Sequence, residues 1–283
     1  MGLNPSNGIQ ENMPASAYAD ILRRIQGALE AARAVFTRFT PGAVKAEYKA
    51  RHDPVTEADH AVDAVLRQTL LRDGEGWLSE ETADDSSRLQ NERVWIVDPL
   101  DGTREFVLGL PEFCVSVGFV ENGRPVAGGI LNPATDQSFL GAVDAGVLYN
   151  GKPAAASQRT SLAGALVLAS RSEVRRGEWK RFEGTRFKIQ TMGSIAYKLA
   201  LVSAGFADAT FTLTPKHEWD VAAGAALVMS AGGFVRTLEN SELTLNRRNP
   251  RLSGLVACGP LLSDELMALV EPHIRLAKSP QRP

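Results

Sequence analysis

The sequence is poor in cysteine and has no long apolar run. Its two cysteines, Cys114 and Cys258, are far apart in apolar segments, which is too few for a disulfide framework. We expect both to be buried free thiols in a reducing compartment. The longest apolar run, Leu162 to Ala169, contains Gly164 and is too short to cross a bilayer. Residues 1–15 hold no apolar stretch typical of a signal peptide. A cytoplasmic protein without a membrane partner is therefore expected.

An excess of one charge is also lacking. The 31 basic and 33 acidic residues are mixed along the chain and give a formal net charge of −2. Because no long basic stripe is present, a nucleic acid polymer is not an expected partner. A small anionic substrate is compatible with this balance if a metal ion supplies positive charge. The four histidines form no zinc-type spacing such as H-E-x-x-H.

The chain of 283 residues is 44% hydrophobic, which is enough for one large domain or two closely packed lobes. We expect a flexible tail at 1–15, an N-terminal α+β lobe at 16–155 with an antiparallel sheet, and a C-terminal α/β lobe at 156–283. Apolar periodicity predicts long helices over 16–39, 57–71, 195–204, 219–231 and 262–277. Short apolar runs predict strands at 94–97, 113–120, 125–131, 137–143, 147–149, 166–169, 186–190, 209–213, 234–238 and 255–258.

Acidic residues recur at the edges of predicted elements. The four acidic patches are Asp53 to Thr56, Leu78 to Thr82, Trp95 to Thr103 and Glu218 to Asp220. In the third patch, Pro99 restricts Asp98 to an extended conformation at the end of a strand, and Asp101 begins a turn into a helix. Both carboxylates are therefore expected to face one point. Gly102 allows close approach of a ligand, and the amides at this helix start favour a phosphate.

Carboxylates that meet at one point repel each other unless cations lie between them, and such hard oxygen ligands suit Mg²⁺. Each patch alone has a simpler interpretation. The third patch alone is more often a turn, and Asp220 alone is typical of a helix cap. For Asp59, which follows Thr56 by three residues, we keep the helix cap as the preferred interpretation.

Taken together, the patches resemble the inositol monophosphatase superfamily of Mg²⁺-dependent, lithium-sensitive phosphatases. The motifs that carry the resemblance are Asp53 to Asp59, Glu80-Glu81, Asp98 to Thr103 and Trp219 to Gly224, and the match covers residues 16 to 260. The resemblance implies a five-layer αβαβα sandwich, a small phosphorylated substrate and a homodimer. The chain has Ser79 where the family commonly has glycine, a position outside the ligand set.

The resemblance also implies roles for individual residues. Two or three Mg²⁺ ions are expected, one held by Glu80, Asp98 and the Leu100 carbonyl and a second by Asp98, Asp101 and Asp220. The implied catalytic residues are Glu80 and Thr103, which orient the attacking water, and Asp53, which bonds Thr103. Glu81 would support the site without contacting the metal ions directly. The implied substrate-binding residues are Glu80, Leu100, Asp101, Gly102, Thr103, Gly193, Ser194, Lys198 and Asp220.

Two branches of the superfamily compete for the substrate. The stretches Val97 to Phe106, Ser170 to Ser172 and Lys198 to Val202 resemble bacterial 3′(2′),5′-bisphosphate nucleotidases, which convert adenosine 3′,5′-bisphosphate to AMP and phosphate. Inositol monophosphatases usually have glutamate where this chain has Leu213, so that branch and other sugar phosphatases are the alternative. Arg171 and Lys198 are candidates to meet a second phosphate or the base, or else are solvated surface charges. A remote alternative is an inactive regulatory protein on this fold.

Overall fold

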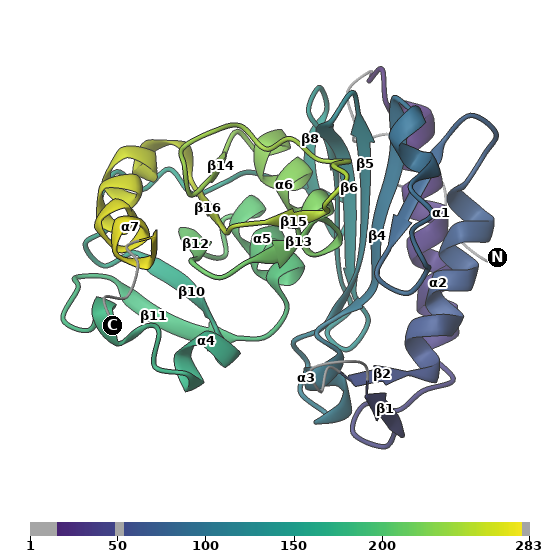
Figure 1. The fold of residues 1–283 in the computed structure, drawn as a ribbon, viewed down its shortest axis with the longest axis horizontal. Coiled ribbons are helices and arrows are strands. Elements are labelled where there is room, and N and C mark those ends of the chain that lie inside the picture. Colours follow the sequence, from purple (N-terminus) through teal and green to yellow (C-terminus); the bar gives the residue numbers. More distant parts are fainter. Residues whose placement is uncertain (1–15, 49–53, 279–283) are drawn as a thin grey trace.

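The structure, a computed structural model, describes residues 16–48 and 54–278. The predicted tail at 1–15 and the catalytic candidate Asp53 lie outside the described residues. Within them, helices and sheets alternate in layers across the molecule (Figure 1). In the described ranges no helix is both long and apolar enough to span a membrane.

The first sheet has seven strands in the order β3-β4-β5-β6-β7-β8-β9. Its strands are β3 (Gly76–Ser79), β4 (Arg93–Asp101), β5 (Cys114–Glu121), β6 (Arg124–Asn132), β7 (Gln137–Ala142), β8 (Gly146–Tyr149) and β9 (Lys152–Ala154). Strand β3 runs parallel to β4, whereas the other neighbours are antiparallel. The predicted antiparallel sheet is thus confirmed, with a parallel strand added at one edge.

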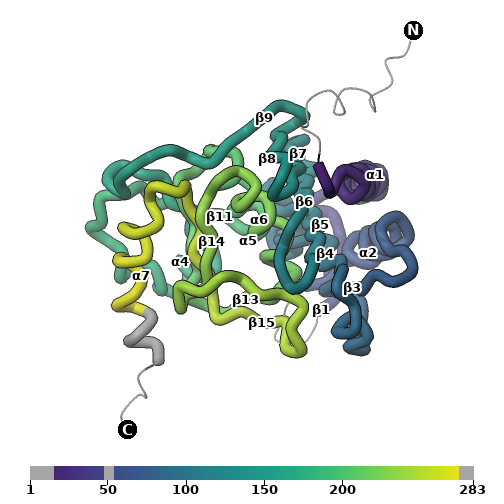
Figure 2. Tube along the Cα trace, turned by 90° about the horizontal axis from the view of Figure 1, so that it is seen from above, coloured from purple at the N-terminus to yellow at the C-terminus, as the bar shows by residue number. Residues whose placement is uncertain are grey.

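Two long helices cover one face of this sheet. Helix α1 (Ala19–Phe36) and helix α2 (Glu57–Leu70) lie side by side in Figures 1 and 2. Their apolar stripes bury Ile25 and Leu66 against Trp95 and Phe119 of the sheet. The short strands β1 (Ala46–Tyr48) and β2 (Pro54–Thr56) pair antiparallel before α2 begins.

The middle layer consists of α5 (Ile195–Ser203) and α6 (Glu218–Ser230), which separate the two sheets. Helix α6 lies directly on the backbone of the first sheet. A Cβ atom at Gly128 would stand 2.5 Å from the Ala223 carbonyl oxygen, and one at Gly118 would stand 2.7 Å from the Ala222 Cβ. Only glycine permits this approach, so these two positions set the distance between helix and sheet.

The second sheet has five strands in the order β11-β10-β12-β16-β14. They are β10 (Leu166–Ser170), β11 (Lys188–Met192), β12 (Ala209–Thr212), β14 (Phe234–Thr237) and β16 (Leu255–Cys258). Strand β10 is parallel to β11 and β12, whereas β16 is antiparallel to β12 and β14. Helix α7 (Ser263–Lys278) packs on its outer face through Leu266, against Val256 and Phe211. This completes the expected five-layer αβαβα sandwich (Figure 2).

Local differences from prediction have physical reasons. Strand β4 does not end before Asp98 but continues to Asp101, and its pairing with β5 shifts register between these two residues. A shift of this kind re-aims side chains at the end of a strand. The prediction missed the short elements, because they have no apolar run of their own: β1, β2, β3, β9, α4 (Arg171–Arg175), β13 (Lys216–His217) and β15 (Arg251–Leu252). The division into lobes at 155/156 stays a prediction.

Candidate active site

Three carboxylates from separate elements meet beside the middle layer. Glu80 follows β3, Asp98 lies in β4, and Asp220 stands in the first turn of α6. Each offers an oxygen atom, and these atoms all lie within 4.8 Å of one another. Asp220 also caps its helix, since its Oδ2 accepts a hydrogen bond of 2.8 Å from the His217 amide. The cap fixes the direction in which this carboxylate points.

The electrostatics of this cluster favour a cation. Burial, and then the negative charges of Glu80, Asp101 and Asp220, raise the pKa of Asp98 well above its ordinary value. Burial and the charges of Asp101 and Glu80 do the same to the pKa of Asp220. Buried carboxylates that repel each other are stabilised by a cation among them, and a donor set made only of oxygen fits Mg²⁺.

Asp101 lines the same cavity but is tied to the start of α5. Its Oδ2 accepts hydrogen bonds from the Ser194 hydroxyl (2.7 Å) and from the Ala196 amide (2.6 Å). Ser194 holds a φ of 46°, a backbone conformation that costs free energy in any residue but glycine. The structure thus brings Asp101, Gly193 and Ser194 together as expected, whereas metal ligation by Asp101 stays a prediction.

Thr103 stands at the start of α3 (Thr103–Val107), directly after Gly102, which has a φ of 101°. The Thr103 hydroxyl lies 2.9 Å from the Leu100 carbonyl oxygen and 3.1 Å from Asp59 Oδ1. Asp59 is thus a carboxylate partner of Thr103. The expected bond from Asp53 to Thr103 lies outside the described residues and stays a prediction. Burial raises the pKa of Asp59, and hydrogen bonds from Thr56 oppose this.

The expected helix cap at Asp59 is also confirmed. Its Oδ2 accepts hydrogen bonds of 2.7 Å from both the amide and the hydroxyl of Thr56, which completes a capping box at the start of α2. Sequence reasoning assigned the cap but missed the contact with Thr103. The signal available in the sequence was that Asp59 is the last residue of the Asp53 to Asp59 motif.

The turn that carries Glu80 is fixed by Asp63 of α2. Asp63 accepts hydrogen bonds from the hydroxyls of Ser79 (2.5 Å) and Thr82 (2.7 Å), one on each side of Glu80. The Ser79 hydroxyl in turn accepts a bond of 3.2 Å from the Glu81 amide. Serine in place of the usual glycine thus adds two hydrogen bonds to this turn.

The carboxylates open into a cavity of about 230 Å³. Its lining includes every predicted metal ligand and substrate-binding residue, together with Pro54, Arg104, Glu105, Ser170, Arg171, Ser172, Ile195 and Lys216. Two lysines thus line the same cavity as the carboxylates. The sequence analysis missed Lys216, although a lysine three residues before the Trp219 to Gly224 motif was a visible signal.

Lys198 is almost fully buried, with 3% of its surface exposed, so it is not a solvated surface charge. Its ammonium donates to the carbonyl oxygens of Gly193 (3.2 Å) and Ser194 (2.9 Å). An ammonium has three N–H donors, so these two bonds leave one for another acceptor. Burial, with a further contribution from the positive charge of Lys216, lowers the pKa of Lys198 to about 8.

Arg171 also lines the cavity, but acidic neighbours engage it. Its Nη2 lies 2.5 Å and 2.6 Å from the two carboxylate oxygens of Glu112, which also accepts a bond of 2.7 Å from the Gly193 amide. Leu213, by contrast, packs against the outer core of the second sheet and lines a different pocket. The cavity is therefore rich in cations and does not include residue 213.

Comparison with known proteins agrees with this geometry. Residues 19–275 match the model of the inositol monophosphatase family. The chain is 36% identical to inositol monophosphatase 3 of Solanum lycopersicum, over 71% of this chain and 80% of that protein. It is 31% identical to an inositol-1-monophosphatase of Rhizobium meliloti, over 73% and 78% of the two chains. A solved inositol monophosphatase from Anabaena superposes with a TM-score of 0.75 and 27% identity, covering 91% of this chain and 97% of that one.

Proposed function

The chain belongs to the inositol monophosphatase family, whose members are Mg²⁺-dependent phosphatases, and we propose that it is a 3′(2′),5′-bisphosphate nucleotidase. The proposed reaction is hydrolysis of adenosine 3′,5′-bisphosphate to AMP and phosphate. The observation that carries the proposal is the pair of lysines in the cavity, Lys198 and Lys216, which line it together with the metal-site carboxylates. A substrate with a second phosphate would use both sets of groups.

The residues present fit Mg²⁺, because the cluster of Glu80, Asp98 and Asp220 offers only carboxylate oxygens. We propose that the Leu100 carbonyl and Asp101 complete the ligand set for two or three ions. When bound, Mg²⁺ would supply positive charge for the transferred phosphate and make water more acidic.

The chain's own groups would orient the attacking water and accept its proton. We propose that Glu80 and the Thr103 hydroxyl bind this water. Thr103 cannot act as a strong base alone, but its hydroxyl faces the buried Asp59 carboxylate at 3.1 Å. A carboxylate whose pKa is raised by burial is a better proton acceptor near neutral pH than an ordinary one. Attack would be in line, without a covalent enzyme intermediate.

A second phosphate would find its partners among the cations of the cavity. Lys198 is held by two carbonyl oxygens and has no charged hydrogen-bond partner in the described part of the chain. Burial is the main cause of the lowered pKa of Lys198, and repulsion by the Lys216 ammonium lowers this pKa further. An anion bound beside both would relieve this repulsion. Neutral inositol hydroxyls would not relieve this repulsion. The position at which inositol monophosphatases usually have a glutamate to contact these hydroxyls is Leu213 in this chain.

The alternative is an inositol-1-monophosphatase or another sugar-phosphate phosphatase, and the names of the relatives favour it. An inactive regulatory protein is the remote alternative. Against it, every carboxylate that the family motifs require is present in the sequence. A homodimer stays a prediction from the resemblance.

The test is phosphate release with Mg²⁺ from adenosine 3′,5′-bisphosphate, adenosine 3′-monophosphate and inositol 1-phosphate at equal concentrations. We expect the bisphosphate to have the highest kcat/KM, by about 10-fold or more over adenosine 3′-monophosphate, a factor equal to one added charge-assisted hydrogen bond. The Asp98→Asn variant serves as the blank for contaminating phosphatases. A preference for inositol 1-phosphate would replace the proposal by the alternative, and release from none would support the inactive protein.

A further inference from the structure

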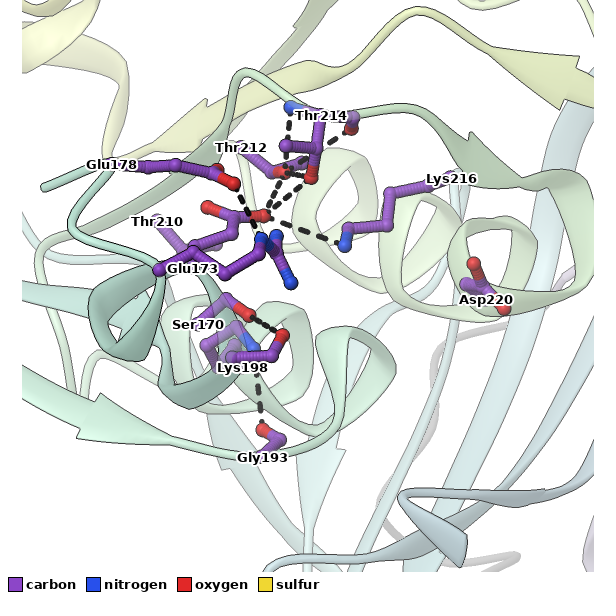
Figure 3. A network of polar contacts seen from close by, with 12 residues as sticks. Ser170, Glu173, Glu178, Gly193, Lys198, Thr210, Thr212, Thr214, Lys216 and Asp220 are labelled. Carbon is purple, nitrogen blue, oxygen red and sulfur yellow. Dashed lines mark hydrogen bonds and ion pairs between the residues drawn. The ribbon is translucent and has the colours of Figure 1, made fainter. Parts of the chain in front are cut away.

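Behind the cavity lies a buried carboxylate that belongs to none of the family motifs. Glu173 of α4 is 2% exposed and does not line the active-site cavity. Its Oε1 accepts hydrogen bonds from the hydroxyls of Thr212 (2.5 Å) and Thr214 (2.7 Å), and its Oε2 accepts one from the Trp179 indole (3.1 Å). Figure 3 shows Thr212 and Thr214 beside the Glu173 carboxylate.

Glu173 is held in its charged form. Burial would raise its pKa, but the positive charge of Lys216 and the bonds from Thr212, Thr214 and Trp179 outweigh this and lower the pKa below its ordinary value. A buried charge is tolerated only with such partners. Among the described residues, the cation that forms an ion pair with Glu173 is Lys216, whose ammonium lies 3.4 Å from Oε1.

Lys216 stands between two sets of negative charge. It belongs to β13, which leads directly into α6 and Asp220. Burial raises the pKa of both Asp101 and Asp220, and the positive charge of Lys216 partly opposes this rise, so Lys216 is within electrostatic reach of the metal-site carboxylates. In Figure 3 its ammonium nevertheless points toward Glu173, and Asp220 lies away from that end of the side chain.

We propose that Glu173 is a positioning residue that keeps Lys216 away from the metal-site carboxylates. Held in this way, Lys216 presents its ammonium to the second anionic group of the substrate, and it does not compete with Mg²⁺ for Asp101 and Asp220. The substrate part of this inference rests on the proposed function. The metal part does not, because it concerns only where the ammonium lies.

The central variant is Glu173→Gln, which removes the charge but keeps an oxygen that can accept from Thr212 and Thr214. Without the charge, Glu173 no longer holds the Lys216 ammonium, which could then turn toward the metal-site carboxylates within its electrostatic reach. We expect the Mg²⁺ concentration for half-maximal activity to rise about 10-fold, and KM for adenosine 3′,5′-bisphosphate to rise by a similar factor. The effect of the substitution should appear in the Mg²⁺ requirement and in KM, whereas kcat at saturating Mg²⁺ and substrate should change little.

The double variant tests whether Glu173 acts through Lys216. Lys216→Met alone should raise KM for the bisphosphate without raising the Mg²⁺ requirement, because no ammonium that could compete with Mg²⁺ is then present. In that background, Glu173→Gln should change the Mg²⁺ requirement less than 2-fold. An undiminished 10-fold effect in the double variant, or no effect of Glu173→Gln on the Mg²⁺ requirement, overturns the inference.

Two controls separate this role from a general effect on folding. Glu178→Gln neutralises a carboxylate nearby that pairs with Arg176 rather than Lys216, and it should leave both quantities unchanged. Glu173→Asp retains the charge and should restore most of the Mg²⁺ affinity even if Glu173→Gln folds poorly. If the wild type does not prefer the bisphosphate, the proposed function fails, while the Mg²⁺ requirement measured with any accepted substrate still decides the positioning role.

Discussion

Asp98 is a carboxylate that the protein buries almost completely, so its charge affects folding as well as activity. Because its pKa is raised in the folded state, protonation favours folding, and this contribution is lost as the pH rises through the raised pKa. Without metal, the protein should therefore lose stability from acidic to neutral pH. At neutral pH, Mg²⁺ should restore stability by compensating the charges.

The variant Asp98→Asn separates these two effects. At pH 7.5 without Mg²⁺ we expect its Tm to exceed that of the wild type, because one buried charge is gone. Its Tm should increase less on addition of Mg²⁺, and turnover should fall by more than about 100-fold. Thermal unfolding with and without Mg²⁺, together with phosphate release, checks both. Retained activity would remove Asp98 from the metal site.

Asp59 uses its two oxygens for two different purposes. Asp59→Asn keeps only one acceptor, so either the Thr56 cap or the contact with Thr103 is lost. We expect a loss of about 1 kcal/mol in the free energy of unfolding and a fall in kcat of about 10- to 100-fold. The control Thr56→Ala weakens the same cap and should cost stability with little change in kcat. Equal kcat losses in the two variants would contradict a role for Asp59 beside Thr103.

At the scale of elements, the predictable parts were those with a pattern of their own. Helices α1 and α2 follow their apolar stripes, and β5 and β6 follow apolar runs joined at Asn122-Gly123. Strands β13 and β15 have two residues each and exist only because they pair with each other. Lys216, on β13, was missed for the same reason as Glu173: its role depends on contacts between segments distant in sequence.

The turn between β3 and Thr82 offers a test at this scale, because Asp63 of α2 fixes both of its ends. Asp63→Asn should weaken the bonds from Ser79 and Thr82 and allow Glu80 to move. We expect the Mg²⁺ concentration for half-maximal activity to rise about 10-fold, with a smaller change in KM at saturating Mg²⁺. The exposed Glu57→Gln on the same helix is the matched control. An unchanged Mg²⁺ requirement would mean that the turn holds its shape without Asp63.

At the scale of the whole molecule, the sequence resemblance predicted the five layers, whereas periodicity alone predicted only two halves. The placement of α6 in the middle layer has a visible reason, since Val221 to Val228 are all buried and leave no polar face. A helix that is apolar all round belongs between two other layers. The meeting point of Glu80, Asp98 and Asp220 could not be read from periodicity, because it depends on how these layers stack.

Gly128 lies where α6 rests on the first sheet. Gly128→Ala would place a methyl group 2.5 Å from the Ala223 carbonyl oxygen, and helix α6 must then move. We expect a loss of about 1–3 kcal/mol in the free energy of unfolding and a raised Mg²⁺ requirement, since Asp220 moves with the helix. Gly27→Ala, on the outer helix α1 with nothing within 4 Å, is the control and should lower neither stability nor Mg²⁺ affinity. An unchanged Mg²⁺ requirement in Gly128→Ala would show that Mg²⁺ binding by Asp220 does not depend on how closely α6 packs on the first sheet.

Because α6 packs directly on Gly118 and Gly128 of the first sheet, the proposed metal site should be sensitive to changes in the interior of the protein. Asp220 lies on α6, and α6 packs on the backbone of the first sheet at these glycines. No flexible side chain lies between helix and sheet at these two positions to absorb a displacement. Substitutions deep in the middle layer, far from any phosphate, should then be detected first as weakened Mg²⁺ binding. A magnesium titration would therefore report on side-chain packing in the middle layer. Core substitutions that change side-chain volume could be ranked by their effect on Mg²⁺ binding before any unfolding is measured.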